Sequence, residues 1–443
     1  MTGGTINLTG SFDFVVTAYQ NESRLSKIVE MVTAALGSKP QIQRLVDRVA
    51  AVFVPIVIVL AIVTLVVWLL AGAAFSFALK NTIAILIIAC PCALGLATPM
   101  AIMVAVGRAA SLGILFKGSE SLEQVGKVRI LYFDKTGTLT EGKFQVGKIM
   151  PLEMTEDRFL YYVSSVEKRS EHLLAKTVVA YVRDRGITLS DVEDFTSLAG
   201  AGASGRVDGR NVLIGTRMLM EARGVEVTPL LGRYNEQVGS GNTVIFAALE
   251  SKLIGMISFS DIIKTEARKT IDAVKSLGVI TAIITGDNRA VAEQVARTLG
   301  ISDVEAELLP QQKLNRINAR KESGEIVGMV GDGINDAPAL ATADVGIALA
   351  SGTEVAIEAA AVTLTGNGLH KIPTAIRLAR ATVRNIKQNL FWAFFYNVAA
   401  IPVAAGLFYP VFKIQLAPAI AALAMSLSSI FVVTNALRLK RFV

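Results

Sequence analysis

Four long stretches without a charged residue constrain this sequence more than any other feature. They cover residues 49–79, 81–107, 388–412 and 414–437. Each exceeds the roughly 20 residues that a helix needs to cross a bilayer. Four buried helices of a large soluble protein are the alternative, but charge-free runs of this length rarely occur outside membranes. The stretches therefore predict two membrane-spanning helical hairpins. They are separated by the 280 residues from 108 to 387, whose sequence is as polar as that of an ordinary soluble domain.

Basic residues predict the orientation of these hairpins. An even number of crossings places the beginning, the middle and the end of the chain on one side of the membrane. Lys and Arg gather at the span ends on that side, at Lys39, Arg44, Arg48, Arg108, Lys117, Arg384, Lys387, Arg438, Lys440 and Arg441. By the positive-inside rule this side is the cytoplasm. The net charge of +7 then reflects topology and not nucleic-acid binding, because no basic stripe with interleaved aromatic residues occurs. We expect an integral protein of the plasma (inner) membrane with cytoplasmic soluble domains and no nucleic-acid partner.

Three short β-type runs in the middle segment each end at polar residues. The runs are 128–133, 281–284 and 326–330, and they are followed by Asp134, by Thr285 and Asp287, and by Asp332 and Asp336. Helical stretches separate the runs, and strands that alternate with helices predict a parallel, doubly wound α/β sheet. Ligands bind beyond the carboxyl ends of the strands in such sheets. The polar residues are therefore expected to converge, although Asp134 and Asp332 are far apart in the chain.

These residue types suit phosphoryl transfer. A carboxylate such as Asp134 can attack the γ-phosphorus of ATP and divide hydrolysis into two easier steps. Asp332 and Asp336 offer the hard oxygen ligands that Mg²⁺ prefers. Lys313 and the Thr285 hydroxyl are candidates for holding the transferred phosphoryl oxygens. Taken alone, an Asp in a turn more often caps a helix or faces solvent, whereas the seven residues from Asp134 to Thr140 are a specific signal.

The runs Asp134-Lys-Thr-Gly-Thr-Leu-Thr140, Thr285-Gly-Asp-Asn288 and Gly331-Asp-Gly-Ile-Asn-Asp-Ala-Pro-Ala-Leu340, in this order, resemble the motifs of a P-type ATPase. The resemblance implies a haloacid-dehalogenase-like phosphorylation domain at 113–143 and 258–370. It implies an α+β nucleotide-binding domain inserted at 144–257, and transmembrane hairpins at 46–112 and 371–443. It also implies that Asp134 forms the aspartyl phosphate, that Lys135 and Thr136 belong to the catalytic set, and that Asp134, Asp332 and Asp336 hold Mg²⁺.

The inserted segment carries a second set of matches. Ser170-Glu-His-Leu-Leu-Ala175 resembles the family's Ser-Glu-His-Pro-Leu-Ala element, with Leu173 in place of Pro. A lone His is more often an ordinary surface residue, and Gly-x-Gly alone is a weak signal. With the resemblance, the implied ATP-binding residues are Glu167, Glu171, His172, Gly200 and Gly202.

Cys90-Pro91-Cys92 lies in the middle of the second apolar stretch. Pro91 should free the carbonyl of Ile87 and break the helix, which would bring the two thiols towards one point. Residues one position apart do not easily form a disulfide of normal geometry, so two thiols are expected. Two small buried residues beside a kink are the alternative. Thiolates select soft ions such as Cu(I) and also suit Zn(II).

The other polar residues of the four stretches favour a monovalent cargo. None of the stretches contains Asp, Glu, Lys, Arg or His, whereas a pump for a divalent ion would be expected to use an intramembrane charge. The stretches do contain Tyr396, Asn397, Met425 and Ser429, which would more often be packing residues if they occurred singly. Together with Cys-Pro-Cys they resemble the Cu(I)-transporting subgroup, in which Ag(I) would be equally acceptable. The zinc, cadmium and lead subgroup instead has a Lys and an Asp in the last two spans.

Residues 1–45 resemble the closing part of the family's actuator domain and its link to the membrane. No Thr-Gly-Glu, the family's phosphate-hydrolysing loop, occurs in the sequence. We therefore expect the C-terminal part of a longer Cu(I) exporter, with the lipid bilayer, the missing N-terminal part and a copper chaperone as partners. The alternatives are a Zn(II)-type pump and a truncated, non-transporting membrane protein that binds ATP.

Overall fold

The computed structural model describes residues 40–90, 92–170, 172–198, 201–332, 336–349, 354–366 and 368–442. Its internal contacts divide the chain into two compact units. Among the described residues, one unit comprises residues 40–129, 321–328 and 340–442, and the other comprises residues 130–320 and 329–339, with the gaps given above.

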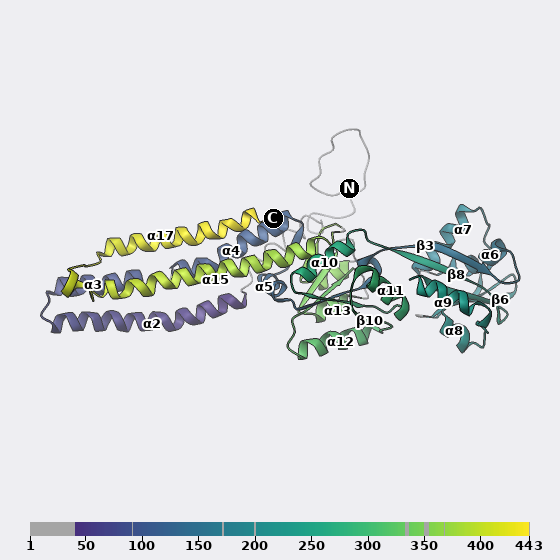
Figure 1. Ribbon diagram of the computed structural model, residues 1–443, viewed down its shortest axis with the longest axis horizontal. Coiled ribbons are helices and arrows are strands. Elements are labelled where there is room, and N and C mark those ends of the chain that lie inside the picture. Colours follow the sequence, from purple (N-terminus) through teal and green to yellow (C-terminus); the bar gives the residue numbers. More distant parts are fainter. Residues whose placement is uncertain are drawn as a thin grey trace, which may run out of the picture. The chain divides into compact units, whose positions relative to one another are not determined.

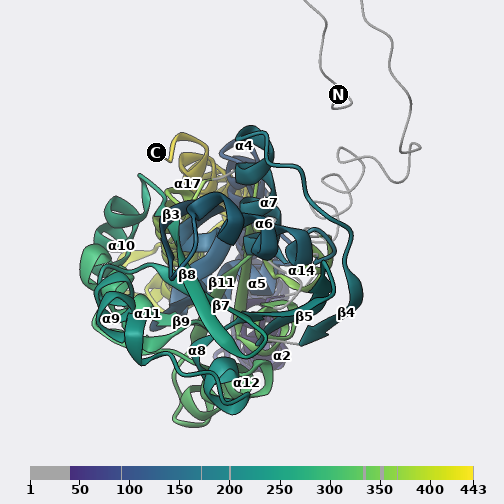
Figure 2. The same ribbon diagram turned by 90° about the vertical axis from the view of Figure 1, so that its right-hand side faces the viewer.

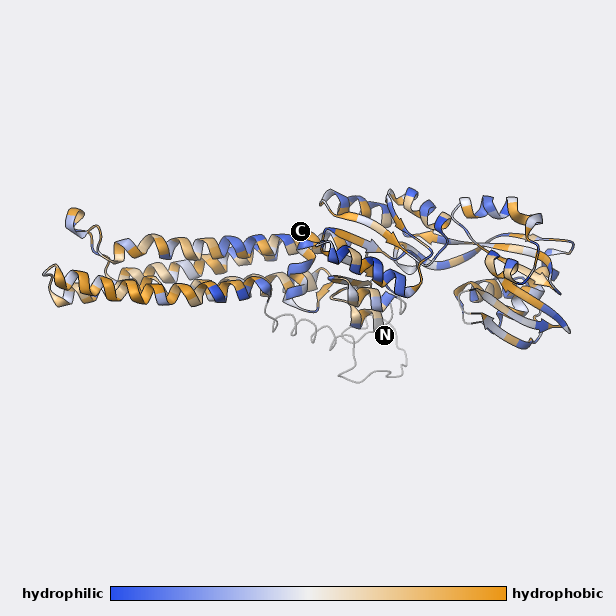
Figure 3. Ribbon diagram, turned by 90° about the horizontal axis from the view of Figure 1, so that it is seen from below, coloured by the Kyte–Doolittle hydropathy of each residue, from blue (hydrophilic) through white to orange (hydrophobic). Residues whose placement is uncertain are grey.

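A bundle of long helices dominates the first unit (Figure 1). Its members are α2 (Gln41–Leu70), α3 (Phe75–Ile88), α4 (Cys92–Ser111), α15 (Lys371–Ala404) and α17 (Pro418–Leu437). Their apolar side chains are largely exposed, and Figure 3 shows the bundle mostly in the colour of hydrophobic residues. Within the described residues, three segments are long and apolar enough to cross a membrane: Gln41–Leu70, Phe75–Ser111 and Pro418–Arg441.

The first predicted hairpin is confirmed, but its turn was misplaced. Helix α2 ends at Leu70, and Gly72 turns the chain with φ +76°, a conformation that glycine adopts without steric cost. Helix α3 then begins at Phe75, so Lys80 lies inside the second span, with its side chain exposed. The prediction that no span contains a charged residue is therefore wrong at this position.

The third predicted stretch does not begin at a helix end. Residue 388 lies inside α15, which runs without interruption from Lys371. The first half of α15 carries basic residues, and α15 is not among the three segments that are apolar enough to span. The stretch also ends earlier than predicted, because α15 stops at Ala404 and a turn at Gly406 leads to the short helix α16 (Tyr409–Phe412).

The first unit also contains strands β1 (Ile114–Phe116), β13 (Val362–Leu364) and β12 (Val345–Leu349), which are neighbours in this order. Strand β13 is antiparallel to β1 and parallel to β12. The accompanying short helices are α5 (Ser119–Lys127), α13 (Ala337–Thr342) and α14 (Glu354–Ala359). Helix α15 is attached to α5 by the Arg380 Nε donor, 3.1 Å from the carbonyl oxygen of Gly126.

The second unit contains the predicted parallel sheet. Strands β11 (Val327–Gly331), β2 (Ile130–Phe133), β9 (Ile280–Ile284) and β10 (Asp303–Glu305) are neighbours in this order, and β2, β9 and β10 are parallel. The helices between them are α10 (Ala267–Ser276), α11 (Arg289–Leu299) and α12 (Pro310–Glu322). The three strands predicted to end at carboxylates are β2, β9 and β11, so the predicted convergence rests on direct neighbours in the sheet.

A second sheet, which is antiparallel, is formed by the middle part of the same unit's sequence. Its order is β3 (Thr140–Pro151), β8 (Lys252–Ile263), β7 (Thr243–Leu249), β6 (Arg210–Gly215), β5 (Gly202–Val207) and β4 (Glu193–Leu198). Figure 2 shows β7 and β8 side by side. The predicted domain boundaries at 143/144 and 257/258 fall within β3 and β8, which pair with each other.

Helices cover both faces of this antiparallel sheet. On one face, Ile245, Ala247 and Leu249 of β7 pack with α6 (Glu156–Glu167) and α7 (Leu173–Asp184). On the other face, the alternate residues Val244 and Phe246 pack against α8 (Arg217–Ala222) and α9 (Leu231–Gly239), which follows the short η3 turn (Thr228–Leu230). Successive side chains of a strand point to opposite faces, so β7 is apolar from Val244 to Leu249.

Candidate active site

Asp134 lies immediately after β2, and its backbone N–H donates to the carbonyl oxygen of Val330 in β11, 2.9 Å away. Its side chain is buried, with 10% of its surface exposed. A carboxylate in this position needs a compensating positive charge, because burial penalises the ionised form.

Lys313 of α12 supplies that charge. Its Nζ lies 2.8 Å from Oδ1 of Asp134 and 3.2 Å from Oδ1 of Asp336. All three side chains are buried. Helix α12 follows β10, so the sheet topology places a lysine next to an aspartate 179 positions earlier in the chain. The three residues that the sequence predicted for this site are therefore in direct contact.

The protonation of these groups follows from burial and from their neighbours. Burial raises the pKa of Asp134 to about 7, while the Lys313 ammonium opposes the rise and the Asp336 carboxylate adds to it. Burial, followed by the Asp336 carboxylate, raises the pKa of Asp332 to about 6. The pKa of Lys313 is raised in spite of its burial, because Asp134 and Asp336 favour the ammonium form. Burial therefore outweighs the compensation that Lys313 gives to Asp134.

Lys135 and Thr136 bind a different aspartate. The Lys135 Nζ lies 2.7 Å from Oδ2 of Asp287, which follows β9, and the Thr136 hydroxyl donates to the same oxygen at 3.3 Å. Lys135 is almost completely buried. Thr285 is also buried, and its hydroxyl oxygen accepts a hydrogen bond from the N–H of Asp287 at 3.2 Å. Thr285 and Asp287, which follow β9, are thus connected to the loop after Asp134 through Lys135 and Thr136.

Gly137 is required where the loop after Asp134 approaches Asp332. Its φ is +75°, and a Cβ at this position would lie 2.2 Å from Oδ2 of Asp332. A larger residue would therefore displace the aspartate as well as strain the backbone. Gly331 has a similar role, since a Cβ there would lie 2.8 Å from the Cβ of Asp336.

Two charged residues of this site were missed by the sequence analysis. Asp261, near the end of β8, lies 2.5 Å from the Thr140 hydroxyl and 3.9 Å from the Lys135 Nζ. Lys264 follows β8 and donates to the carbonyl oxygen of Gly137 at 2.7 Å, and burial lowers its pKa. Both side chains are buried. A pair of opposite charges at the end of an apolar strand was the available signal.

Of the predicted nucleotide residues, Glu167 and His172 lie at the ends of the helices on one face of the antiparallel sheet, and Gly202 begins β5. Glu167 ends α6, and burial raises the pKa of its carboxyl group against a hydrogen bond from Ser170. His172 caps α7, where its Nδ1 accepts the N–H of Leu174 at 3.3 Å, and burial lowers its pKa. A Cβ at Gly202 would lie 2.0 Å from the carbonyl oxygen of Ile214, so β5 approaches β6 closely there. Glu171 and Gly200 lie outside the described residues.

The predicted break in the second span is confirmed. Helix α3 ends at Ile88 and α4 begins at Cys92. The prediction that the Ile87 carbonyl is freed is wrong, because its oxygen accepts the N–H of Cys90 at 3.1 Å. The Asn397 Nδ2 in α15 donates to the carbonyl oxygen of Cys90 at 3.5 Å. The Cys92 side chain lies outside the described residues. Cys90 is present as a disulfide and not as the free thiol that the sequence analysis expected.

The remaining predicted cargo residues lie on different faces of their helices. Asn397 is buried, whereas Tyr396 is 39% exposed and stacks on Trp392, with ring centroids 5.5 Å apart. In α17, Met425 and Ser429 are half-buried, and the adjacent Ser428 is buried. Ser428 lies three residues after Met425, which places both on one helix face. Ser428 is the neighbour of the predicted Ser429 in the same Met-x-x-Ser-Ser pattern, and it is the more buried of the two serines.

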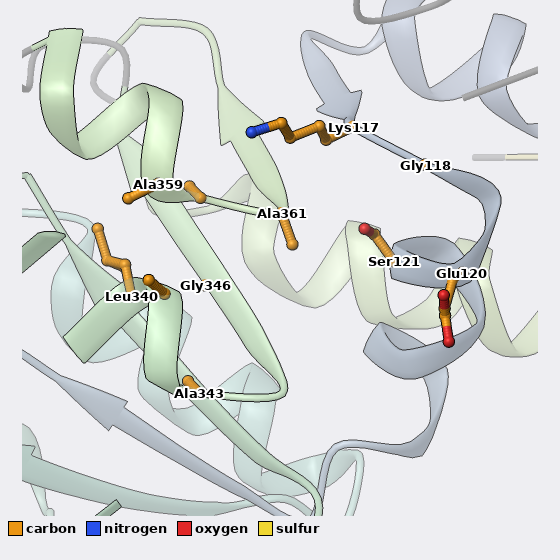
Figure 4. A pocket seen from close by; sticks show the side chains of 11 residues that line it. Lys117, Gly118, Glu120, Ser121, Leu340, Ala343, Gly346, Ala359 and Ala361 are labelled. Carbon is orange, nitrogen blue, oxygen red and sulfur yellow. The ribbon is translucent and has the colours of Figure 1, made fainter. Parts of the chain in front are cut away.

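The first unit also has a pocket of about 300 Å³ beside α5 (Figure 4). Lys117 and Ser121 lie on one side, and small residues such as Ala359 and Ala361 lie on the other. None of the predicted site residues lines it. In the described part of the chain, no group of three or more His, Cys, Asp or Glu side chains is arranged to hold a metal ion.

Known proteins resemble this chain along nearly its whole length. Residues 128–344 match the family of haloacid dehalogenase-like hydrolases. Copper-transporting ATPase 1 of Rhizobium meliloti is 47% identical, over 99% of this chain and 54% of that protein. The copper-exporting P-type ATPase of Legionella pneumophila is 46% identical, over 99% of this chain and 60% of that protein. The silver exporting P-type ATPase of Salmonella typhimurium is 46% identical, over 99% of this chain and 54% of that protein.

A solved structure agrees with these relatives. The crystal structure of a zinc-transporting Pib-type ATPase in the E2.Pi state has a TM-score of 0.72 and 34% sequence identity, and the match covers 96% of this chain and 69% of that one. The chain spans between 54% and 60% of the length of the three curated relatives. Similarity of this extent, in sequence and in structure, shows that the chain belongs to the P-type ATPase family, in its heavy-metal class.

Proposed function

We propose that this chain serves ATP-driven export of Cu(I), or equally of Ag(I), across a membrane. The observation that carries the proposal is the Lys313 ammonium between the buried carboxylates of Asp134 and Asp336. This arrangement holds one carboxylate at the end of a parallel strand beside a cation, as a nucleophile towards a phosphoryl group requires. The named activities of the copper and silver relatives support the choice of cargo.

The first step is phosphoryl transfer to Asp134. The ionised carboxylate attacks the γ-phosphorus of ATP, a new O–P bond forms, and the bond between γ-phosphorus and the β,γ-bridging oxygen breaks, so that ADP leaves. Lys313 favours the ionised form of Asp134 against the effect of burial, and it faces the transferred oxygens. Lys135, Thr136 and Thr285 hold the loop and Asp287 in place around the nucleophile. In the second step water would hydrolyse the aspartyl phosphate.

The chemistry of three carboxylates suits a magnesium ion, which Asp134, Asp332 and Asp336 would hold through oxygen donors. Burial raises the pKa of Asp134 and Asp332 and the Asp336 carboxylate adds to the rise, so a bound cation would favour their ionised forms. A bound Mg²⁺ would neutralise phosphate charge during the transfer. Gly137 and Gly331 leave room beside these carboxylates because neither has a Cβ.

We further propose the domain roles that the motifs predict. Residues 113–143 and 258–370 form the phosphorylation domain, and residues 144–257 bind ATP through Glu167, Glu171, His172, Gly200 and Gly202. Residues 46–112 and 371–443 form transmembrane hairpins, and residues 1–45 belong to the actuator domain and its linker. The soluble parts lie in the cytoplasm at the plasma (inner) membrane, where a copper chaperone would deliver the cargo.

The cargo site combines Cys90 and Cys92 with groups from α15 and α17. Asn397 reaches the Cys90 carbonyl, and Met425 offers a soft thioether. Tyr396, Ser428 and Ser429 complete the candidate set, and the buried position of Ser428 favours it over Ser429. Metal binding by cysteine needs free thiolates, so the disulfide at Cys90 represents a state that a reductant must open.

Labelling with γ-labelled ATP tests the nucleophile. The purified chain should form acid-stable phosphoprotein in the presence of Mg²⁺ and a reductant. Asp134→Asn should abolish the label and retain nucleotide binding. Persistent labelling of Asp134→Asn would contradict the assignment.

The cargo is tested by the metals that stimulate labelling. Cu(I) and Ag(I) should stimulate it, and Zn(II) should not. Stimulation by Zn(II) alone would support the second candidate, a zinc pump, which the similarity to the zinc-transporting structure favours. Labelling without continuous ATP turnover under any metal would support a chain that is phosphorylated but does not transport by itself.

A further inference from the structure

Three asparagine side chains lie buried between α15 and α17. Asn385 and Asn389 belong to α15 and Asn435 belongs to α17, and their exposed fractions are 6%, 0% and 7%. The two helices run alongside each other (Figure 1). An amide group away from water is costly unless it is hydrogen-bonded.

Every donor and acceptor atom of these three amides has a partner. Nδ2 of Asn435 donates to Oδ1 of Asn389 at 2.8 Å, and Nδ2 of Asn389 donates to Oδ1 of Asn385 at 3.1 Å. Nδ2 of Asn385 then donates to the carbonyl oxygen of Asn435 at 2.9 Å. Arg438 Nη1 donates to Oδ1 of Asn435 at 3.2 Å. The bonds form a closed ring across the two helices, which we call the asparagine ring (Asn385, Asn389 and Asn435).

The asparagine ring specifies the register of α15 against α17. Two side chains one helical turn apart on α15 meet one side chain and one carbonyl of α17. A shift by one residue moves a group by about 1.5 Å along the axis and rotates it by about 100°. Such a shift would break both bonds between the helices, Asn435 to Asn389 and Asn385 to the Asn435 carbonyl, and leave buried amides without partners. Apolar contacts alone would tolerate the same shift.

The same helix faces continue to the candidate cargo site. Asn397 lies eight residues beyond Asn389 on α15, and Ser428 lies seven residues before Asn435 on α17. These spacings correspond to about 12 Å and about 10 Å along the helices. An apolar layer that includes Ala97, Ala393 and Val432 fills the space between. The asparagine ring therefore does not touch the cargo site itself, and its amide oxygens are already occupied.

We propose that the asparagine ring of Asn385, Asn389 and Asn435 holds α15 and α17 in one register and thereby fixes the position of Asn397 on α15 relative to Met425 and Ser428 on α17. These are positioning residues for the cargo, and the inference rests on the proposed function of the cargo site. A loss of the ring allows α17 to slide or rotate against α15, which separates the metal ligands without changing the nucleotide site.

The test variant is Asn389→Leu. It removes the two ring bonds of the fully buried amide and puts an apolar side chain of similar size in its place. Thr382→Val is the matched control. Thr382 is also buried on α15, but its hydroxyl bonds only to the carbonyl of Leu378 in the same helix, at 2.7 Å. The readouts on the purified, reduced chain are the Ag(I) and ATP concentrations that give half-maximal labelling of Asp134.

We expect Asn389→Leu to raise the half-maximal Ag(I) concentration about tenfold, which corresponds to about 1.4 kcal/mol. The half-maximal ATP concentration should stay within about twofold, and Thr382→Val should leave both values near those of the unsubstituted chain. An unchanged Ag(I) dependence in Asn389→Leu would overturn the inference. So would an equal shift in Thr382→Val, or a parallel shift for ATP, because each indicates general destabilisation.

A second variant covers the case in which Asn389→Leu does not fold. Asn435→Ala keeps the backbone carbonyl that Asn385 uses and removes the bonds to Asn389 and Arg438, and the same Ag(I) shift is expected. An unchanged Ag(I) dependence in this variant would also overturn the inference. Labelling of the unsubstituted chain that does not respond to any soft metal would instead overturn the proposed cargo function, and the inference with it.

Discussion

At the scale of single residues, the loop after β2 shows how closely the site is constrained. Gly137 combines a positive φ with a close approach to Asp332, and its carbonyl oxygen accepts the buried ammonium of Lys264. The backbone here serves both as a spacer and as a hydrogen-bond acceptor. A residue without reactive groups can therefore tolerate as few substitutions as the nucleophile close to it in the chain.

Gly137→Ala should reduce labelling of Asp134 at least about tenfold. A left-handed alanine costs about 1–2 kcal/mol, and its Cβ would also push Asp332 away. Gly186→Ala is the control, since Gly186 has φ +72° and a Cβ there would meet nothing within 4 Å. Initial labelling rates at saturating ATP measure the effect. An equal loss in both variants would mean that backbone strain, and not the displacement of Asp332, is responsible.

Glu167→Gln should raise the melting temperature of the nucleotide-free chain at pH 7–8. Burial raises the pKa of Glu167, so the folded state binds more protons than the unfolded state in the range above the ordinary value of 4.5. The stability contributed by Glu167 is therefore complete below that value and is lost as the pH rises through the folded-state pKa. The difference between variant and parent should shrink as the pH falls towards 4.5. Glu226→Gln, at an exposed position, should show no such trend in the same melting series.

At the scale of elements, small residues decide how the membrane helices approach one another. Ala93 and Ala97 of α4 form a buried cluster with Ala393 of α15 and Val432 of α17. Small side chains let helix backbones come close in a membrane, where burial of apolar surface gives little advantage over lipid. The contacts of α4 therefore depend on the volume of these residues more than on their hydrophobicity.

Ala97→Leu should destabilise the bundle by about 1–3 kcal/mol, because the added methylene groups have no space between α4, α15 and α17. Ala51→Leu makes the same change at an exposed position of α2 and should have little effect. Thermal melting in detergent, followed by size-exclusion elution, compares the two. Equal stability of both variants would show that the cluster is loosely packed.

At the scale of the whole molecule, the proposed phosphoryl transfer and the proposed metal transport use residues of different units. Cys90 and Asn397 belong to the first unit, and Asp134 and Lys313 belong to the second. Coupling between them is what a pump requires, and it can be measured without assuming any arrangement of the units. The observable is the effect of a metal on phosphoryl transfer.

Replacing Cys90 and Cys92 together with Ser should remove the dependence of Asp134 labelling on Cu(I) or Ag(I), because a hydroxyl is a poor ligand for soft ions. Binding of a fluorescent ATP analogue should remain unchanged. Metal-dependent labelling that persists in the double variant would show that another site senses the metal.

The sequence alone predicted the features that depend on local patterns. Charge-free length predicted the membrane helices, alternation of strands and helices predicted the parallel sheet, and Pro91 predicted the break between α3 and α4. The position of Asp134 at a strand end followed in the same way. The predicted helix ends were wrong at two places. Gly72 forms a turn inside an uninterrupted apolar run, and α15 continues through the change from basic to apolar sequence.

Only the tertiary structure decided which distant side chains meet. Lys313 reaches Asp134 because α12 follows β10 at the same sheet edge, and Asp261 and Lys264 join the site because β8 returns beside β3. The burial of Ser428 rather than Ser429 and the closure of the asparagine ring depend on how α17 is rotated against its neighbours. Hydrophobic patterns specify which face of a helix or strand is buried. They do not specify which other helix or strand packs against that face. Contacts between elements arise from packing and hydrogen bonding in three dimensions, which no local pattern contains.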